Sequence, residues 1–237
     1  DVCSSDLHVT GAFVPGAIVA LHDNPKITGG STPSIGQGWT AAGIAVDTKL
    51  PVKITDNDNI AGVSSPSRNA AYGVLLLSAG PGHVITGNER IAGGPDNMGF
   101  YEHVGLYIQA SGALIEGNQA IVGNDDPLQR SSDAWGIFSR ASDVVIRDNA
   151  LILGGHSAGD IGHGTSIGVY VWSPNNGDTS KALLEDNTII AGTSTRLAYG
   201  LVIEERTQEV GTLTHRQLTG VGPCQGKEDL GQPHQPS

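Results

Sequence analysis

One asparagine recurs at nearly regular intervals through most of the 237-residue chain. Six segments align around it without gaps, and they place it at Asn24, Asn57, Asn88, Asn118, Asn149 and Asn187. Each asparagine has an aliphatic residue three positions before it, an isoleucine three positions after it and a glycine five positions after it. A second series, in which a glycine precedes an apolar stretch, lies between these segments, and its glycines are 30 to 32 residues apart. Such a fixed period indicates structural repeats that stack on one another.

The pattern inside each repeat favours strands over helices, because apolar and polar residues alternate with period two. We predict three strands per repeat: one that begins at the glycine, one that ends at the asparagine, and a short one around the following isoleucine. Stacked repeats of this kind form an all-β fold, a right-handed parallel β-helix (a solenoid) of six to seven coils with about 31 residues each. The aliphatic residues before the asparagines should form one inward column, which consists of Leu21, Ile54, Ile85, Ile115, Ile146 and Leu184.

The asparagine column is predicted to lie at the turn between the second and third strands. Asparagine tolerates left-handed backbone and forms local hydrogen bonds, and stacked asparagines can bond to one another along the axis. We therefore assign this column a structural role. On this interpretation Ile115→Ala should cost roughly 2–5 kcal/mol of stability, and Asn118→Ala only about 1 kcal/mol.

The chain divides into three parts. The first seven residues, DVCSSDL, resemble the translated end of a sequencing adapter, so we expect an artefact at 1–7 and a truncated N-terminus. The β-helix is expected over 8–206. Residues 207–237 lack the asparagine and end polar and proline-rich, so a degenerate coil or a tail is expected there. Neither end supplies a convincing cap, which is typical of a fragment of a longer protein.

Composition excludes several classes of partner. The net charge of −11 argues against nucleic acid, whose phosphates attract basic surfaces. No apolar run approaches the length of a transmembrane helix, so we expect no membrane insertion. Two cysteines are poor evidence for a metal site, and we expect no resident cofactor.

The repeats resemble those of the pectin-lyase-like superfamily of right-handed β-helices, from residue 8 to about 206. The resemblance implies an extracellular or cell-envelope protein with a polysaccharide as its partner. It also implies that ligands lie on the outer face of one sheet, beside the loops that precede it. Here those loops are predicted at 30–42, 63–72, 94–104, 124–135, 155–167 and 193–199.

Outward positions of the glycine-led strands supply candidates for substrate binding. These are Tyr107, Phe138, Arg140, Tyr170 and Trp172. Exposed aromatic rings flanked by polar groups suit sugars, which present apolar faces and hydroxyl edges. Two alternatives stay open: the flanking loops could cover the rings, or a second subunit could pack on them.

Three residues are the catalytic candidates: Glu102, Asp133 and His163. Glu102 and Asp133 occupy the same position before the glycine in adjacent coils, which places them about 5 Å apart. Such a carboxylate pair could divide the roles of acid and base, or bind calcium. The alternative is two solvated loop acids.

His163 lies in the segment 162–168, which resembles the glycine-histidine-glycine segment of polygalacturonases. In that family the histidine supports aspartates that hydrolyse the glycosidic bond with inversion. Only His163 matches, because the family's aspartate pair and basic motif have no counterparts here. The alternative is a turn histidine. Arg140 is the basic residue best placed for lyase chemistry.

The sequence thus predicts a β-helix that binds a polysaccharide and could process it as a hydrolase or a lyase. Whether it is an enzyme stays open. The alternative is a non-catalytic surface, adhesin or structural β-helix.

Overall fold

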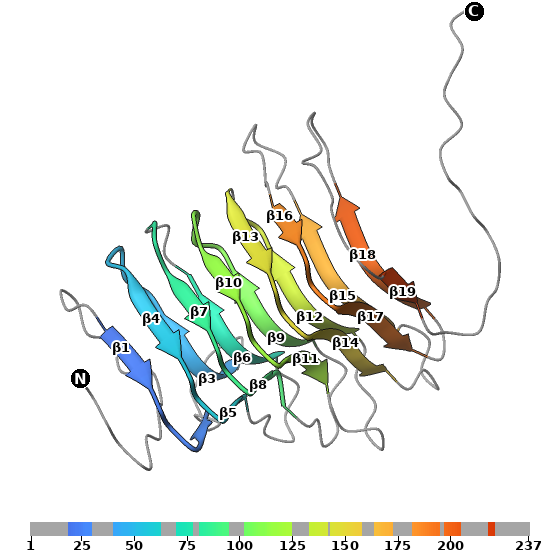
Figure 1. The fold of residues 1–237 in the computed structure, drawn as a ribbon. Coiled ribbons are helices and arrows are strands. Elements are labelled where there is room, and N and C mark those ends of the chain that lie inside the picture. Colours follow the sequence, from blue (N-terminus) through green and yellow to red (C-terminus); the bar gives the residue numbers. More distant parts are fainter. Residues whose placement is uncertain are drawn as a thin grey trace, which may run out of the picture.

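The fold is described here from a computed structural model, which covers residues 19–29, 40–62, 70–77, 81–94, 102–124, 133–141, 143–157, 164–172, 182–194, 197–204 and 218–220. All regular elements in these residues are β-strands, and they form three parallel sheets. The predicted all-β class and the parallel β-helix are therefore confirmed. Figure 1 shows the coils stacked in chain order, from blue to red.

The three sheets run the length of the stack. Sheet A contains β1 (Val19–His22), β4 (Val52–Thr55), β7 (Val84–Thr86), β10 (Leu114–Glu116), β13 (Val144–Arg147) and β16 (Ala182–Glu185). Sheet B contains β2 (Ile27–Thr28), β5 (Asn59–Ala61), β8 (Arg90–Ala92), β11 (Ala120–Asn124), β14 (Leu151–Ser157), β17 (Ile189–Ser194) and β19 (Leu218–Gly220). Sheet C contains β3 (Thr40–Val46), β6 (Ala70–Leu76), β9 (Glu102–Ile108), β12 (Asp133–Ser139), β15 (Thr165–Trp172) and β18 (Leu197–Glu204). Strand β19 falls within the region 207–237, where the sequence predicted a degenerate coil or a tail.

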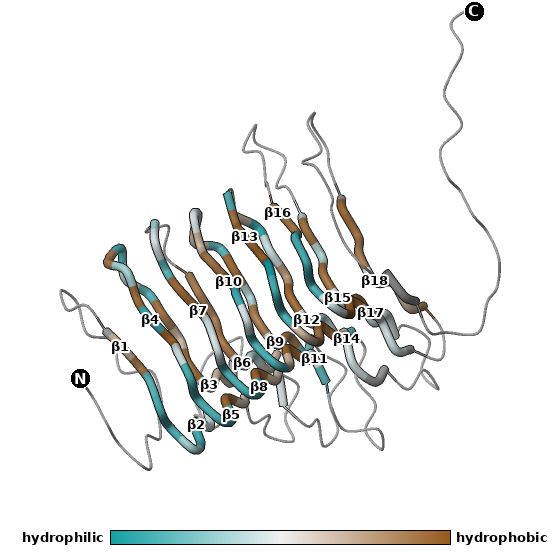
Figure 2. Tube along the Cα trace, viewed as in Figure 1, coloured by the Kyte–Doolittle hydropathy of each residue, from teal (hydrophilic) through white to brown (hydrophobic). Residues whose placement is uncertain are grey.

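The predicted inward column of sheet A is confirmed. Its six aliphatic residues are paired in register from coil to coil and all are buried. The isoleucines after the asparagines form an equally buried column in sheet B, which consists of Ile27, Ile60, Ile91, Ile121, Ile152 and Ile190. In Figure 2 the same order of hydrophobic and hydrophilic segments recurs in successive coils. The core is thus built from rows of like residues along the axis.

Glycines mark the corner where sheets B and C meet. A Cβ at Gly105 would lie 2.7 Å from the carbonyl oxygen of Gly136 and 2.9 Å from that of Val122. A Cβ at Gly123 would lie 2.6 Å from the backbone nitrogen of Trp135. Because the two sheets touch backbone to backbone, no larger residue fits without a shift.

The observed start of the sheet C strands differs from the predicted one. They were predicted to begin at the glycine, but they begin three residues earlier, as β9 and β12 do at Glu102 and Asp133. The glycine is therefore an interior residue of the strand. Both carboxylates lie on strands and not in loops.

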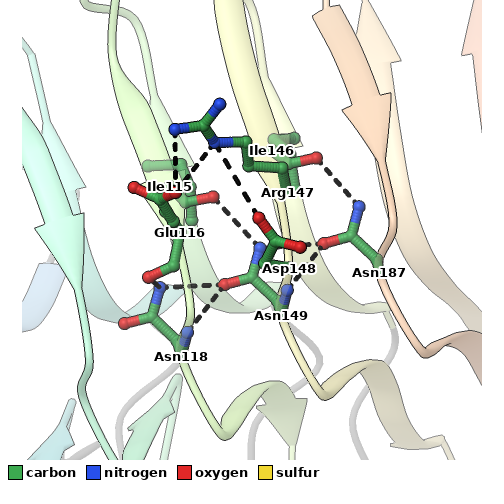
Figure 3. Close-up of polar contacts among 8 residues, drawn as sticks. All are labelled: Ile115, Glu116, Asn118, Ile146, Arg147, Asp148, Asn149 and Asn187. Carbon is green, nitrogen blue, oxygen red and sulfur yellow. Dashed lines mark hydrogen bonds and ion pairs between the residues drawn. The ribbon is translucent and has the colours of Figure 1, made fainter.

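The asparagines form a continuous hydrogen-bonded ladder, part of which Figure 3 shows. The Asn118 Oδ1 atom accepts hydrogen bonds from the side-chain Nδ2 and the backbone nitrogen of Asn88, at 2.9 and 3.1 Å. The Asn118 Nδ2 atom donates to Asn149 Oδ1 at 2.9 Å and to the carbonyl oxygen of Ile85 at 3.0 Å. Equivalent side-chain bonds join the rest of the series from Asn24 to Asn187. All six asparagines are buried, so the ladder replaces water for every amide along the turn.

The left-handed backbone at this turn belongs to the residue before each asparagine. The six residues concerned have φ values from 46° to 68°, and they are Asp23, Asp56, Gly87, Gly117, Asp148 and Asp186. Glycine adopts this conformation freely, and aspartate tolerates it better than most residues. The asparagine is therefore selected for its buried amide and not for its own backbone conformation.

These contacts change the expected stability of one variant. Asn118→Ala would leave several buried donors and acceptors without partners, at about 1–3 kcal/mol each. We now expect it to cost about 3–5 kcal/mol, at least as much as Ile115→Ala at about 2–5 kcal/mol. Chemical denaturation of both variants measures this, with the exposed neighbour Gln119→Ala as a control that should change stability by no more than about 0.5 kcal/mol. A loss of only about 1 kcal/mol for Asn118→Ala would restore the original estimate.

Candidate functional site

The outer face of sheet C carries a second apolar cluster, separate from the interior core. Its buried members are Leu75, Val104, Tyr107, Trp135, Phe138 and Ile167, with Ala42, Tyr72, Tyr170, Trp172 and Val202 packed against them. All but one of them come from two rows of the sheet: the residues one position before the glycines and the residues two positions after them. The exception is Trp172, which lies four positions after its glycine. The glycine interrupts the alternation of the strand, so both rows contribute to one face.

The aromatic residues of this face are less open than the sequence predicted. Tyr107 and Phe138 expose only 8% and 7% of their surface, so the prediction that these two rings face water is wrong. Tyr170 and Trp172 are half-buried. The physical reason is that each ring fills the space beside the ring of the next coil.

The ring geometry is that of a packed stack. Phe138 lies at its centre, with ring centroids 5.1 Å from Tyr107, 4.8 Å from Trp135 and 5.1 Å from Tyr170. Tyr72 extends the stack by an edge-on contact with Tyr107 at 5.4 Å. Offset and edge-on rings at these distances attract one another beyond simple burial.

Trp135 and Tyr72 were missed as members of this face. Strict alternation, counted from the glycine, predicted that the residues one position before it face inward. The contact between sheets B and C shifts the alternation by one residue, and these residues therefore lie on the outer face. The signal available in the sequence was the bulk of that row, which contains Tyr72, Val104, Trp135, Ile167 and Tyr199. The indole nitrogen of Trp135 is buried and has no acceptor among the described residues.

The two candidate carboxylates stand side by side at the N-terminal end of the strands. Glu102 and Asp133 are direct partners in the register of β9 and β12. The Asp133 Oδ1 atom accepts a hydrogen bond from the backbone nitrogen of Thr165 at 3.1 Å. Burial, and after it the charge of Asp133, raises the pKa of Glu102 above its ordinary value. Burial and the nearby Glu102 also raise the pKa of the Tyr72 phenol.

The raised pKa gives Glu102 the character of an acid. It keeps a proton on Glu102 to higher pH, as a general acid requires. Asp133, whose Oδ1 accepts the hydrogen bond from Thr165, lies directly beside it. A catalytic role for the pair stays a prediction.

A group of polar side chains lies at the opposite end of the same strands. The Arg140 guanidinium is 4.0 Å above the ring of Trp172 and donates to the Tyr107 hydroxyl oxygen at 3.3 Å. Gln109 donates to the same oxygen at 2.8 Å. Arg140 lies seven positions beyond Asp133 along the extended chain, which corresponds to about 23 Å. The structure therefore brings Arg140 together with Tyr107 and Trp172, but not with the carboxylate pair.

Three further predictions concern a catalytic histidine, a metal site and membrane insertion. His163 lies outside the described residues. Within the part of the chain that is described, no group of three or more histidine, cysteine, aspartate or glutamate side chains is arranged to hold a metal ion. No helix in that part is long and apolar enough to cross a membrane.

Comparison with known proteins found no match: no family model, no curated protein and no solved structure is significantly similar to this chain. The evidence for the parallel β-solenoid is therefore the structure itself. Membership of the pectin-lyase-like superfamily stays a prediction.

The burial of Phe138 predicts a structural role that an open platform would not have. Phe138→Ala removes the centre of the ring stack and should cost about 3–5 kcal/mol of stability. The exposed Leu77, which directly follows β6, provides the control, since Leu77→Ala should cost no more than about 0.5 kcal/mol. Thermal and chemical denaturation measure both. A loss for Phe138→Ala as small as that of the control would show that the ring is not part of a packed cluster.

The environment of Glu102 predicts a pH-dependent effect on stability. Because the pKa of Glu102 is raised in the folded state, folding favours its protonated form, and stability falls as pH rises above the ordinary pKa of 4.5. Glu102→Gln removes this loss, so the variant should be more stable than the wild type at pH 8. The difference should shrink at pH 4. Melting temperatures at both pH values measure it.

Glu116→Gln is the matched control for this experiment. Glu116 lies in the neighbouring sheet A and forms an ion pair with Arg147 at 2.8 Å. Its replacement should give no gain at pH 8. A Glu102→Gln variant that is less stable than the wild type at both pH values would contradict the assigned environment.

Proposed function

We propose that this β-helix binds a polysaccharide on the outer face of sheet C. The observation that carries the proposal is the row of aromatic rings along this face, flanked by polar groups at both ends of the strands. A sugar chain offers the matching chemistry, since its apolar ring faces stack on aromatics and its hydroxyls bond to the flanking groups. Successive coils repeat at about 4.8 Å, which is comparable to one sugar ring.

The proposed contact surface is narrower than the aromatic row. Tyr107 and Phe138 are buried and pack beside the neighbouring rings. The half-buried Tyr72, Tyr170 and Trp172 are the rings that a ligand could touch. On this proposal the protein acts outside the cell or in the cell envelope, where such polymers occur.

The carboxylate pair supports a second step, cleavage of the bound chain. In this scheme Glu102 donates its proton to the glycosidic oxygen as the bond to the anomeric carbon breaks. Asp133 either removes a proton from the water that attacks this carbon, or attacks it directly to form a glycosyl-enzyme that water then hydrolyses. Hydrolysis fits the described residues better than elimination, because Arg140 lies about 23 Å from the pair along the strand and cannot act with it on one sugar.

A structural β-helix is the alternative, and one observation favours it. The rings of Tyr107, Trp135 and Phe138 are buried by one another and by their surroundings. A second core on the outside of sheet C explains them without any ligand. Under this alternative the half-buried rings at the margin are simply its edge.

Two variants separate these functions. A panel of soluble polysaccharides is screened for binding by calorimetry and for cleavage by the release of reducing or unsaturated ends. Tyr170→Ala removes a half-buried ring and should lower affinity by about tenfold, the effect of roughly 1.4 kcal/mol. Asp133→Asn keeps the shape of the site and should abolish any cleavage while leaving binding intact.

Each outcome selects one function. Loss of turnover in Asp133→Asn with retained binding supports the enzyme. Loss of affinity in Tyr170→Ala without any cleavage by the wild type supports a binding protein. If no polysaccharide in the panel binds the wild type, the proposal fails and the structural alternative remains.

A further inference from the structure

We propose that Arg140, Gln109 and the hydroxyl of Tyr107 form a binding site for an oxyanion at the C-terminal end of the sheet C strands. The ligand group would be a sulfate ester or a carboxylate. This site is distinct from the Glu102–Asp133 pair, which lies at the other end of the strands. It rests on the proposed function only in assigning the oxyanion to a polysaccharide.

The position of Arg140 is fixed from two sides. Its guanidinium lies 4.0 Å above the Trp172 ring and donates one hydrogen bond to the Tyr107 hydroxyl. Trp172 is itself packed against Phe138, with centroids 6.3 Å apart and ring planes 22° apart. An arginine held in this way loses little additional freedom when it binds a ligand.

The hydrogen bonds among these three side chains leave most of their donors available. Arg140 uses one of its five N–H groups on Tyr107. The Tyr107 oxygen accepts from both Arg140 and Gln109, so its own hydrogen is left to be donated. Gln109 keeps its second N–H. A cluster with several donors around one guanidinium suits a group that is rich in acceptor oxygens.

Arg147, in the same coil, provides a comparison for Arg140. Its guanidinium pairs with the Glu116 carboxylate at 2.8 Å. No carboxylate contacts the Arg140 guanidinium within the described ranges, although acidic residues outnumber basic ones by 24 to 13. In a chain with a net charge of −11, an arginine that contacts no carboxylate of the described residues offers its positive charge to an anion from outside.

The test uses one polymer with different charges. Dextran, carboxymethyl-dextran and dextran sulfate of matched length, together with free sodium sulfate, are titrated against the full chain by calorimetry at 0.15 M salt. The protein's own charge repels polyanions, so a preference for a charged probe requires a local site. We expect one of the two charged dextrans to bind about tenfold more tightly than dextran itself.

The variants locate that preference. Arg140→Gln should lower the affinity for the charged probe about tenfold and leave that for dextran unchanged. Tyr107→Phe keeps the buried ring, removes only the hydroxyl, and should lower it in the same direction. Arg147→Gln makes the same change of charge in the same coil and should have no effect. The two charged dextrans distinguish a sulfate site from a carboxylate site.

Several results would overturn the proposal. One is equal affinity for charged and neutral dextran, and another is an equal loss in Arg140→Gln and Arg147→Gln. Binding of free sulfate without either charged polymer would indicate an adventitious ion only. The outcome is separable from the proposed function: loss of binding in Tyr170→Ala but not in Arg140→Gln would retain the polysaccharide surface and remove the oxyanion site. Loss of binding in Arg140→Gln but not in Tyr170→Ala would retain the oxyanion site alone.

Discussion

The register between coils is the constraint on which every other feature of this protein depends. An interior asparagine of the ladder, such as Asn118, accepts two hydrogen bonds from the preceding coil and donates two to the next. A slip of one residue would break these bonds at a buried position and would turn the isoleucine rows away from the core. Because the pairing register is fixed by the inward-facing residues, it also fixes which outward-facing residues are neighbours. Glu102 and Asp133 are neighbours for the same reason that Ile85 and Ile115 are.

Much of this order could be predicted from the sequence, because repetition makes one pattern visible many times. The inward row of sheet A follows from a fixed offset to the asparagine, and it is confirmed. The backbone details do not follow in the same way. The left-handed residue is the aspartate or glycine before the asparagine, such as Asp148 or Gly117, and both types also suit ordinary turns. The glycines of sheet C resembled strand starts, since only the contact with sheet B explains why Gly105 lies inside a strand.

The outer face of sheet C was predicted only in part, and the reason is spatial. Alternation along one strand shows which residues share a face, but burial depends on neighbours in other coils. Phe138 is covered because Tyr107, Trp135 and Tyr170 surround it, and these residues come from three different strands. Large rings in adjacent rows fill one another's open space. A column of aromatic residues therefore forms a packed layer, and only the half-buried rings at its margin can contact a ligand.

The position of that margin bears on what the site can do. The half-buried rings Tyr170 and Trp172 lie two and four residues beyond the glycine of their strand, close to the Arg140 row. A chain lying over the Tyr170 row would pass about 7 Å from the row of Arg140 but about 16 Å from the row of Asp133. Only a chain shifted toward Tyr72 would reach the carboxylates, across a row that is mostly buried. The accessible surface therefore favours recognition near Arg140, and cleavage requires the ligand to occupy the other end of the strands.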